Sequence, residues 1–459
     1  MERRNAWKDY NNTEIKELEK LCKDYRLFLD NGKTERECVK EIVKAAEEAG
    51  YINIEEIIKS KKKIKTNDKI YAVNMKKSVA LFRIGTEPIV NGMNILGAHI
   101  DSPRMDVKQN PLYEDTDLAY LDTHYYGGIK KYQWVTLPLA IHGVVALKNG
   151  EVIDIVIGEN DKDPVFCVTD LLIHLAGEQM DKKANKVIEG EQLDILVGSK
   201  PLPKEDKEAV KKMVLSVLKK KYKMEEEDFL SAELEIVPAG KARNAGLDES
   251  MIIGYGQDDR VCAYTSLAAM LDMPKVSRTA CCLLVDKEEI GSVGATGMQS
   301  KFFENSVAEL MNAMGDYSDL NLKRCLAASF MLSSDVSAAF DPNFASAFEK
   351  KNCAYFGRGV VFNKFTGSRG KSGSNDANAE YVGKLRKIMD DNNVAFQTAE
   401  LGKVDIGGGG TIAYILSLYG MNVIDSGVAV LNMHAPWEIT SKADVYEAYK
   451  SYKAFLKDA

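Results

Sequence analysis

The 459-residue chain lacks a large excess of charge of either sign. Its 61 lysine and arginine residues and 68 aspartate and glutamate residues leave a formal net charge of −7. This mildly acidic balance provides no basic footprint for nucleic acid or for an anionic membrane surface. We interpret the lysine-rich runs at 59–69 and 217–229 as solvated faces, since acidic residues directly follow the lysines of the second run. Neither nucleic acid nor a membrane is therefore an expected partner.

Long apolar runs are also missing. No run approaches the roughly 18 residues that cross a membrane, and the first residues, MERRNAWKDY, have no apolar segment of the kind found in a secretory signal. None of the 8 cysteines forms a CxxC pair or another zinc-binding spacing. In a chain of this length we interpret them as reduced core residues, which are typical of a reducing compartment. The expected location is the cytoplasm.

Alternating strand and helix patterns predict an α/β fold. Residues 6–50 carry apolar positions at three- and four-residue spacing, which is typical of helices. Residues 70–102 are rich in strand-like runs, and from about residue 248 onward such runs alternate with helical stretches. This alternation is typical of a sheet covered by helices.

The segment between these two parts has a different character. It combines short β-like runs, such as GVVALKNGEVIDIVIG, with a helix expected near 168–180 and a charged helical run, KEDKEAVKKMVLSVLKKKYK. The strand-rich parts on either side are similar in pattern to each other. We therefore predict one domain made of residues 1–103 and 246–459, interrupted by an inserted domain at 104–245.

Polar side chains follow four of the apolar runs, at the point where each run ends. MNILGAHID ends with His99 and Asp101, CCLLVDKEE with Glu288 and Glu289, ASFMLSSD with Asp335, and GVAVLNMH with His434. Each residue alone has an ordinary interpretation as a turn residue or a helix cap, and the same holds for Asp258 and Asp259 ahead of a helical run. However, sites form at the carboxyl edge of open α/β sheets, and 2 of only 5 histidines fall at these strand ends. The residues as a group therefore predict a site.

The residue types predict a divalent metal centre. Imidazole and carboxylate groups suit zinc, cobalt or manganese, and the set is larger than one catalytic zinc requires. It suits two metals that share a bridging carboxylate, with a further carboxylate outside the ligand set to accept a proton. Adjacent side chains in an extended chain point apart, so Glu288 and Glu289 would divide the roles of ligand and base. The HxD motif at 99–101 supports this scheme, because metal-bound imidazoles commonly contact a carboxylate.

Two glycine-containing motifs are candidates for binding loops. GSRGKSGS, at 367–374, lacks the GxxxxGK[ST] spacing of a phosphate-binding loop, so we interpret it as an ordinary loop. DIGGGGTIAYIL, at 405–416, is a glycine run that opens a helix, and backbone amides at Gly408 and Gly409 could hold an anion or a substrate carbonyl. A tight packing turn is the alternative for these glycines.

Taken together, the motifs resemble a known family. GAHIDSPR, GQDDRVCAY, DKEEIGS, SSDVSAAFDPN, DIGGGGTIA and NMHAPWE occur in the order seen in the aspartyl aminopeptidase and vacuolar aminopeptidase I family of dinuclear zinc metallopeptidases. Any one motif is weak, but the set is highly specific and spans residues 95 to 440 approximately. The resemblance implies a zinc-peptidase-like mixed sheet sandwiched by helices, with an inserted β-rich dimerisation domain. It also implies two divalent metal ions per subunit. Zinc is the expected metal, with cobalt or manganese as alternatives.

The resemblance further implies a role for each residue of the set. One ion would be held by His99 and Asp335 and the other by Glu289 and His434, with Asp258 bridging them, Glu288 as general base and Asp101 orienting His99. Family members assemble into tetrahedral homododecamers built from dimers. His174 matches a position that reaches into a neighbouring subunit's active site, and a core histidine on a helix face is the alternative.

Substrate preference is where the chain departs from the family pattern. Members that prefer acidic N-terminal residues have further histidines after the SSD motif, where this chain has Ala338 and Asp341. Such members also have a lysine near the segment that corresponds to GVVFNK. A simple alignment puts Asn363 at that position, and the nearest lysine here is Lys364, one residue later. The leading hypothesis is therefore a cytoplasmic metalloaminopeptidase that removes an acidic or neutral N-terminal residue from peptides. A metal-dependent deacylase of small N-acyl metabolites and a non-catalytic assembly scaffold of the same fold are the alternatives.

Overall fold

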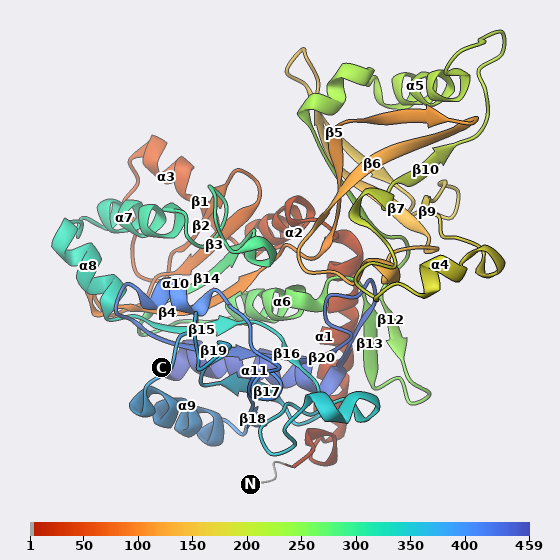
Figure 1. Ribbon diagram of the computed structural model, residues 1–459. Coiled ribbons are helices and arrows are strands. Elements are labelled where there is room, and N and C mark those ends of the chain that lie inside the picture. The colour runs from red at the N-terminus through yellow and green to blue at the C-terminus, as the bar shows by residue number, and fades with distance from the viewer. Residues whose placement is uncertain (1–3) are drawn as a thin grey trace. The chain divides into compact units, whose positions relative to one another are not determined.

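The computed structural model describes residues 4–459, and the chain forms two compact units (Figure 1). The larger unit comprises Met1–Asp101, Ala242–Met433 and Glu438–Ala459, and the smaller unit comprises Ser102–Lys241 and His434–Trp437. The chain passes from one unit to the other after Asp101, Lys241, Met433 and Trp437. The predicted domain bounds, 1–103 with 246–459 and 104–245, stay a prediction. The catalytic and dimerisation roles expected for the two parts stay predictions.

A nine-stranded mixed sheet forms the centre of the larger unit. In sheet order its strands are β1 (Ile52–Asn53), β2 (Lys69–Asn74), β3 (Ser78–Arg83), β14 (Thr279–Val285), β4 (Met93–His99), β15 (Phe330–Ser334), β19 (Asn422–Gly427), β17 (Val360–Asn363) and β18 (Phe396–Thr398). The three central strands β14, β4 and β15 are parallel, with Val285 opposite His99 and Ser333 opposite Gly97. Their carboxyl ends therefore lie at the same edge of the sheet.

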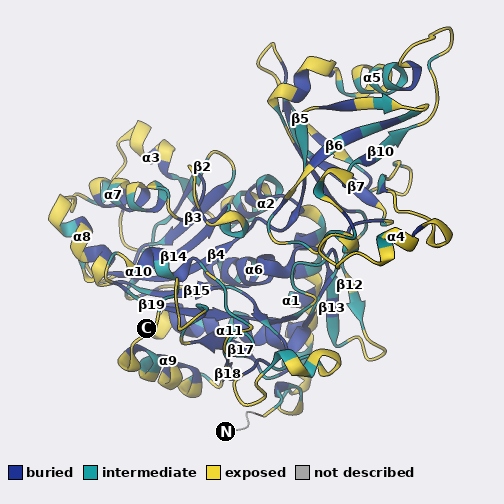
Figure 2. Ribbon diagram, viewed as in Figure 1, coloured by how far each residue is buried: buried dark blue, intermediate teal, exposed yellow. Residues whose placement is uncertain are grey.

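Helices cover both faces of this sheet (Figure 1). They are α1 (Asn12–Asn31), α2 (Glu35–Glu48), α6 (Gln257–Asp272), α9 (Ala379–Asp391) and α11 (Lys442–Asp458) on one face, and α3 (Ile54–Ser60), α7 (Phe302–Met314), α8 (Asp319–Ala327) and α10 (Ala413–Ser417) on the other. Every residue of β4 is buried, because alternate side chains enter opposite cores. Leu96 packs with the first group of helices and Ile95 with the second, and Figure 2 shows the central strands as buried.

The first two helices begin where their sequences provide capping groups. The side chain of Asn11 accepts the amide of Glu14 while the Glu14 carboxylate accepts the amide of Asn11, and Thr34 and Glu37 form the same reciprocal pair before α2. The helices expected within residues 6–50 are thereby confirmed. The expected α/β class, with a mixed sheet between helices, is confirmed as well.

A second, five-stranded sheet completes the larger unit. In sheet order it contains β12 (Arg243–Ala245), β13 (Met251–Gly254), β21 (Glu438–Ser441), β20 (Ala429–Leu431) and β16 (Ser337–Ala338). Strand β13 leads into α6, and β21 leads directly into α11. This sheet therefore fixes the starts of the two helices that pack on the same face of the central sheet.

The smaller unit is built on a seven-stranded sheet. In sheet order its strands are β8 (Val152–Ile157), β7 (Leu139–Ala146), β11 (Ala232–Pro238), β5 (Arg104–Asp115), β6 (Leu118–Tyr126), β10 (Ile195–Gly198) and β9 (Cys167–Val168), accompanied by α4 (Gly177–Met180) and α5 (Ala209–Tyr222). All of its strand pairs are antiparallel. The charged run KEDKEAVKKMVLSVLKKKYK contains α5, so the helix expected there is confirmed.

The helix expected near 168–180 is wrong. Only α4 is α-helical there, preceded by a single 3-10 turn at Ile173–Leu175. Leu172 and Ile173 are among the exposed hydrophobic residues of this segment. Helical stability in proteins comes mostly from burying an apolar face, and this segment buries none of these side chains within the unit.

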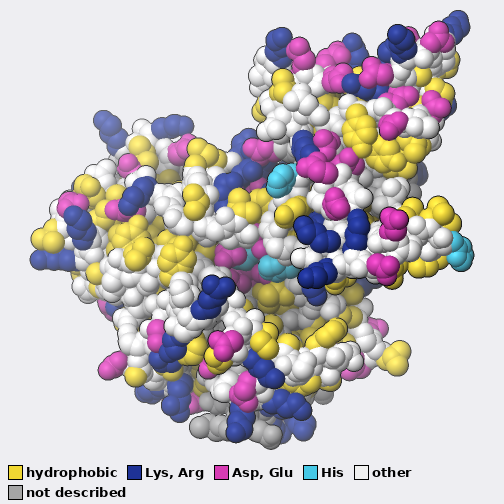
Figure 3. Space-filling model, in the orientation of Figure 1, with side chains coloured by type: hydrophobic (Ala, Val, Ile, Leu, Met, Phe, Trp, Pro, Cys, Tyr) yellow, Lys and Arg dark blue, Asp and Glu magenta, His cyan; other side chains and the backbone are white. Residues whose placement is uncertain are grey.

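Two surface observations bear on partners. Among the described residues, every helix is too short or too polar to span a bilayer. On the face shown in Figure 3, basic and acidic side chains are interspersed. This mixture agrees with the near balance of charge in the composition.

Replacing Gly427 by alanine should destabilise the larger unit. A Cβ atom at this position would lie 1.8 Å from the carbonyl oxygen of Asp335, so the backbone of β19 or the chain after β15 would have to move. We expect a loss of about 3 kcal/mol or more. Calorimetric melting temperature measures the effect. Gly383→Ala in α9 is the matched control, since a Cβ there meets nothing within 4 Å and should stabilise the helix slightly. Equal melting temperatures for both variants would contradict the packing described.

Candidate metal centre

Metal-ligating side chains converge beyond the carboxyl ends of the three central strands. His99 is the last residue of β4, Glu288 and Glu289 lie on a 3-10 turn (η7, Glu288–Ile290) after β14, and Asp335 follows β15, while Asp258 lies in the first turn of α6. One ligand atom from each of His99, Asp258 and Glu289 lies within 4.8 Å of the others, and the same holds for His99, Glu288 and Asp335. The fold thus brings together five of the predicted residues.

The imidazole of His99 is oriented as a metal ligand. Its Nδ1 atom lies 3.0 Å from the carbonyl oxygen of Asp101, which can only accept, so Nδ1 carries the proton in this hydrogen bond. Nε2 then has a free lone pair. This atom is buried, makes no hydrogen bond within the described part of the chain and lies 3.3 Å from Oδ1 of Asp258. A buried nitrogen acceptor that faces carboxylates fits a divalent cation.

The electrostatics of the cluster also favour a cation. Burial alone would lower the pKa of His99, but the close carboxylates of Asp101, Asp258 and Glu288 outweigh burial and raise that pKa well above its usual value. Burial raises the pKa of Asp335 well above its usual range, and nearby carboxylates raise it further, beginning with Glu288. A cation between these groups would relieve the repulsion that opposes their ionisation.

The carboxylate of Asp101 holds the two glutamates in place. Its Oδ1 accepts the amide of Glu288 at 3.1 Å, and its Oδ2 accepts the amide of Glu289 at 3.2 Å. Asp101 is fully buried, and its Oδ1 also lies 3.3 Å from Nδ1 of His99. The residue expected to orient His99 therefore contacts the imidazole and fixes the turn after β14 as well.

The backbone of the glutamate pair differs from the expectation. We expected these adjacent residues in an extended chain, whereas they lie on η7, which is entered through Lys287 at φ 70° and left through Gly291 at φ 95°. Successive residues of a 3-10 turn still direct their side chains apart, since there are about three residues per turn. The two glutamates accordingly belong to different ligand groups, Glu289 with Asp258 and Glu288 with Asp335.

Several supporting residues were not identified from the sequence. The amide of Asp258 donates to the buried carboxylate of Glu438 at 3.0 Å, so Glu438 positions the residue expected to bridge two ions. Arg260 is buried and donates to the carbonyl of Ile100 at 3.2 Å, which secures the chain after His99. The quoted motifs NMHAPWE and GQDDRVCAY contain both residues, but nothing in their local sequence indicates these distant contacts.

His434 belongs to the smaller unit, whereas the two ligand groups consist of residues of the larger unit. Its Nδ1 is 2.8 Å from the carbonyl oxygen of Gly128, also in the smaller unit. As with His99, a carbonyl partner requires the proton on Nδ1 and leaves the Nε2 lone pair for a ligand. The side chain has the tautomer that a metal ligand needs, and its pairing with Glu289 stays a prediction.

The other predicted binding residues lie in varied surroundings. His174 is on the exposed 3-10 turn before α4, so the alternative of a core histidine is wrong. Lys364 follows β17, and its Nζ is 2.6 Å from a carboxylate oxygen of Asp376. The contact of either side chain with substrate stays a prediction.

The glycine run at 407–410 has a packing function in the described chain. The amide of Gly409 donates to the carbonyl of Thr366 at 3.0 Å. A Cβ on Gly408 would lie 2.8 Å from the Cα of Ser368, and its φ of 116° also favours glycine. These contacts favour the tight packing turn, and a contact between this run and substrate stays a prediction.

Comparison with known proteins identifies the family. The family model described as Aminopeptidase I zinc metalloprotease (M18) matches residues 28–456. The chain belongs to the M18 aminopeptidase family. It is a metal-dependent aminopeptidase by family and fold, and the expected resemblance is confirmed.

Similar relatives cover the whole M18 chain. A probable M18 family aminopeptidase 1 from Clostridium acetobutylicum is 62% identical, with 100% of this chain and 98% of the relative covered. The crystal structure of aminopeptidase I from Clostridium acetobutylicum matches with 60% identity and a TM-score of 0.93, covering 100% and 99% of the two chains. The crystal structure of an M18 aminopeptidase from Thermotoga maritima matches with 43% identity and a TM-score of 0.96, covering 100% of both.

Asp101→Asn should weaken zinc binding by this M18 chain. The amide of asparagine keeps one acceptor oxygen but replaces the other with a donor, which would face a backbone amide of η7. Loss of this kind of supporting contact typically lowers metal affinity by about 10- to 100-fold. Zinc titration against a chromophoric chelator measures the affinity. Asp316→Asn, at an exposed position, is the control. If the Asp101 variant bound zinc with wild-type affinity, the hydrogen bonds from the Glu288 and Glu289 amides to Asp101 would not be what positions the ligands.

Proposed function

We propose that this M18 aminopeptidase removes the N-terminal residue of peptides at a centre that binds two divalent ions per subunit. The observation that carries the proposal is the convergence of His99, Asp258, Glu288, Glu289 and Asp335 at one edge of the parallel strands. Three carboxylates and one imidazole exceed the needs of a single catalytic zinc, and a fourth carboxylate remains for proton transfer. Zinc is the proposed metal because it is the metal of the family, and cobalt and manganese suit the same donors.

The residues would divide the ions as the family resemblance implies. His99 and Asp335 would hold one ion, Glu289 and His434 the other, and Asp258 would lie between them. The short contact between His99 Nε2 and Asp258 supports a shared ion there. Glu289 lies in one ligand group with His99 and Asp258.

Glu288 would move the proton in the reaction. Divalent ions held by these residues would polarise the scissile carbonyl and lower the pKa of a bound water. Glu288 accepts the proton from that water and returns it to the amine of the departing peptide. The amide of Glu288 donates to Asp101, which positions the backbone from which this carboxylate extends.

Exchange of each glutamate for glutamine tests this division. Glu288→Gln should retain both ions and lose at least about 100-fold in kcat, which is the lower range for removal of a general base. Glu289→Gln should lose metal. The measurements are metal content by mass spectrometry and hydrolysis of an aminoacyl p-nitroanilide. Near-normal activity of Glu288→Gln, or full metal content in Glu289→Gln, would contradict the assignment.

A matched pair of substrates separates the peptidase from the deacylase alternative. An aminopeptidase should hydrolyse unblocked dipeptides and leave their N-acetylated forms intact, whereas a deacylase should show the reverse preference. The assay is run on metal-stripped protein to which zinc, cobalt or manganese is returned. Absence of hydrolysis with every metal would instead support the non-catalytic scaffold, although the retained ligands and base favour an enzyme.

The N-terminal preference is proposed to be neutral or broad rather than strictly acidic. Lys364 is paired with Asp376, and Asp341 caps the turn that follows β16, where its charge would oppose an acidic substrate nearby. A panel of aminoacyl substrates compares kcat/KM for aspartate, glutamate, leucine and alanine. A strong preference for aspartate or glutamate would overturn this part of the proposal.

Self-association into a tetrahedral homododecamer of dimers is also proposed. A more distant match, the Saccharomyces cerevisiae mApe1 dodecamer, has 19% identity and a TM-score of 0.75 over 94% of this chain and 95% of that chain. Exposed Leu171, Leu172, Ile173 and Leu175 beside His174 supply an apolar surface of the kind that associating chains bury. A cytoplasmic location is proposed from the cysteines, because all 8 are free and most are buried.

A further inference from the structure

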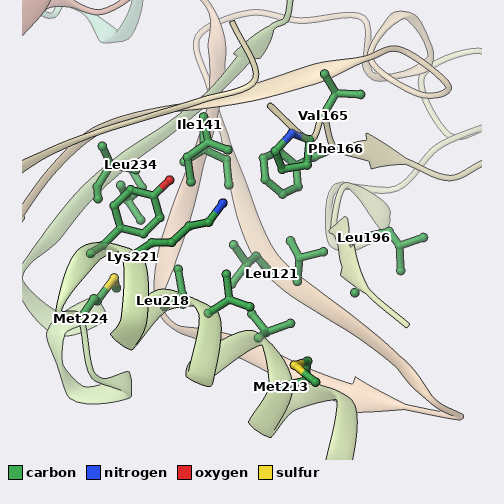
Figure 4. A pocket seen from close by; sticks show the side chains of 18 of the residues that line it. Leu121, Ile141, Val165, Phe166, Leu196, Met213, Leu218, Lys221, Met224 and Leu234 are labelled. Carbon is green, nitrogen blue, oxygen red and sulfur yellow. The ribbon is translucent and has the colours of Figure 1, made fainter. Parts of the chain in front are cut away.

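The smaller unit contains an apolar cavity of about 600 Å³ between its sheet and α5 (Figure 4). Leu121, Ile141, Ile155 and Leu234, from four different strands, form the sheet side. Met213, Val217 and Leu218 line the helix side. The volume lies within the range of small-molecule sites, which are typically about 300–1,000 Å³ and mostly apolar. It is far larger than the gaps that remain in a close-packed protein interior.

The cavity exists because α5 packs tightly only at its beginning. The Glu114 carboxylate accepts the amides of Val210 and Lys211, at 3.0 and 2.8 Å, which anchors the first turn. A Cβ on Gly198 would lie 2.9 Å from Val214, so β10 approaches the helix closely at that point. Ala209 and Val210 are the only buried residues of the helix. Beyond Val214, the apolar stripe of α5, formed by Val217 and Leu218, lines the cavity.

The exposure of that stripe is unusual for a helix that lies on a sheet. Val217 is 43% exposed although it lies on the face directed at the cavity. Figure 2 shows the contrast with α6 and α11, which are drawn as buried along most of their length, and Figure 3 shows hydrophobic surface beside α5. An apolar ligand between the helix and the sheet would bury this surface from both sides.

The polar side chains at the cavity are two lysines and two hydroxyl groups, each of which can donate a hydrogen bond. Lys200 and Lys221 line it together with Ser199 and Tyr222, and no carboxylate does. Lys221 occupies the end of the apolar stripe, and its side chain extends into the cavity among the apolar groups (Figure 4). Other lysines of α5 are paired with acids, such as Lys211 with Glu226 at 2.7 Å and Lys219 with Glu225 at 2.7 Å. The cavity therefore has a mostly apolar lining with two positively charged side chains, Lys200 and Lys221, and no acidic one.

We propose that this cavity is a binding site for an aliphatic monocarboxylate, a medium-chain fatty acid, with its chain between α5 and the sheet and its carboxylate on the ammonium of Lys221. The charge complementarity selects an anionic head group over a neutral or cationic one. At about 30 Å³ for each water-sized group, the cavity has room for roughly 20 such groups, enough for the 14 heavy atoms of dodecanoate. This site lies wholly in the smaller unit and does not depend on the proposed peptidase mechanism.

Titration of the full-length protein with dodecanoate, kept below its micelle concentration, tests the proposal by calorimetry. We expect saturable binding of one dodecanoate per subunit, with dodecanol bound more weakly and dodecyltrimethylammonium weakest. Lys221→Met should weaken dodecanoate binding by roughly tenfold or more, as expected for loss of a hydrogen bond to a charged group. Lys221→Glu should reverse the preference in favour of the cationic amphiphile. Val217→Trp should occupy part of the cavity, leave too little room for dodecanoate and so abolish binding.

Lys220→Met is the matched control, since it removes the same charge from an adjacent residue of α5 that does not line the cavity. It should bind dodecanoate as the wild type does. The Lys221 variants alter an exposed side chain, so they keep the test decisive if Val217→Trp does not fold. Absence of saturable binding by the wild type, or equal losses in the Lys220 and Lys221 variants, would overturn the proposal. The proposal would also be overturned if the wild type did not bind dodecanoate and Val217→Trp changed the oligomer size. That result would identify a second copy of the chain as the occupant of the cavity.

Discussion

The hydrogen bonds made by Asp101 are the contact on which the metal centre depends. The carboxylate of this buried residue accepts the amides of Glu288 and Glu289, and its carbonyl accepts the imidazole N–H of His99. The end of β4 and the turn after β14 are thereby fixed to each other. Because the two amides bind separate oxygens of one carboxylate, the two glutamates are held in a defined rotation about the turn. Ligand and base can then be neighbours in sequence without competing for one ion.

The cluster also links metal binding to the stability of the larger unit. Asp335 and fully buried Asp259 have pKa values well above the usual range, because burial disfavours their charged forms. Bringing such groups together without a cation is unfavourable, whereas divalent ions offset the desolvation and the repulsion. An ion that binds only the folded chain stabilises it in proportion to the logarithm of its concentration over its dissociation constant. Folding and loading of the site are therefore coupled.

Much of the site could be predicted from sequence because it follows from strand ends. His99, Asp335 and the glutamate pair each follow an apolar run, and parallel pairing in the sheet brings those ends to one edge. The role of Glu438 could not be predicted in this way, since its contact with Asp258 joins residues 180 positions apart. The prediction of a helix near 168–180 was wrong for a different reason. Its apolar spacing resembles that of a helix, but no apolar core covers Leu172 or Ile173, and spacing alone does not determine whether a face is buried.

The mechanism depends on Glu289 being a metal ligand and Glu288 a base. Anomalous diffraction at the zinc edge, from crystals of the zinc-loaded protein, tests this division of roles. We expect two zinc peaks about 3.5–4 Å apart, with a carboxylate oxygen of Glu289 at about 2.0–2.2 Å from one of them. Glu288 should lie beyond ligand distance from both peaks. A single peak, or a zinc ion coordinated by Glu288 in the group it forms with His99 and Asp335, would contradict the claim.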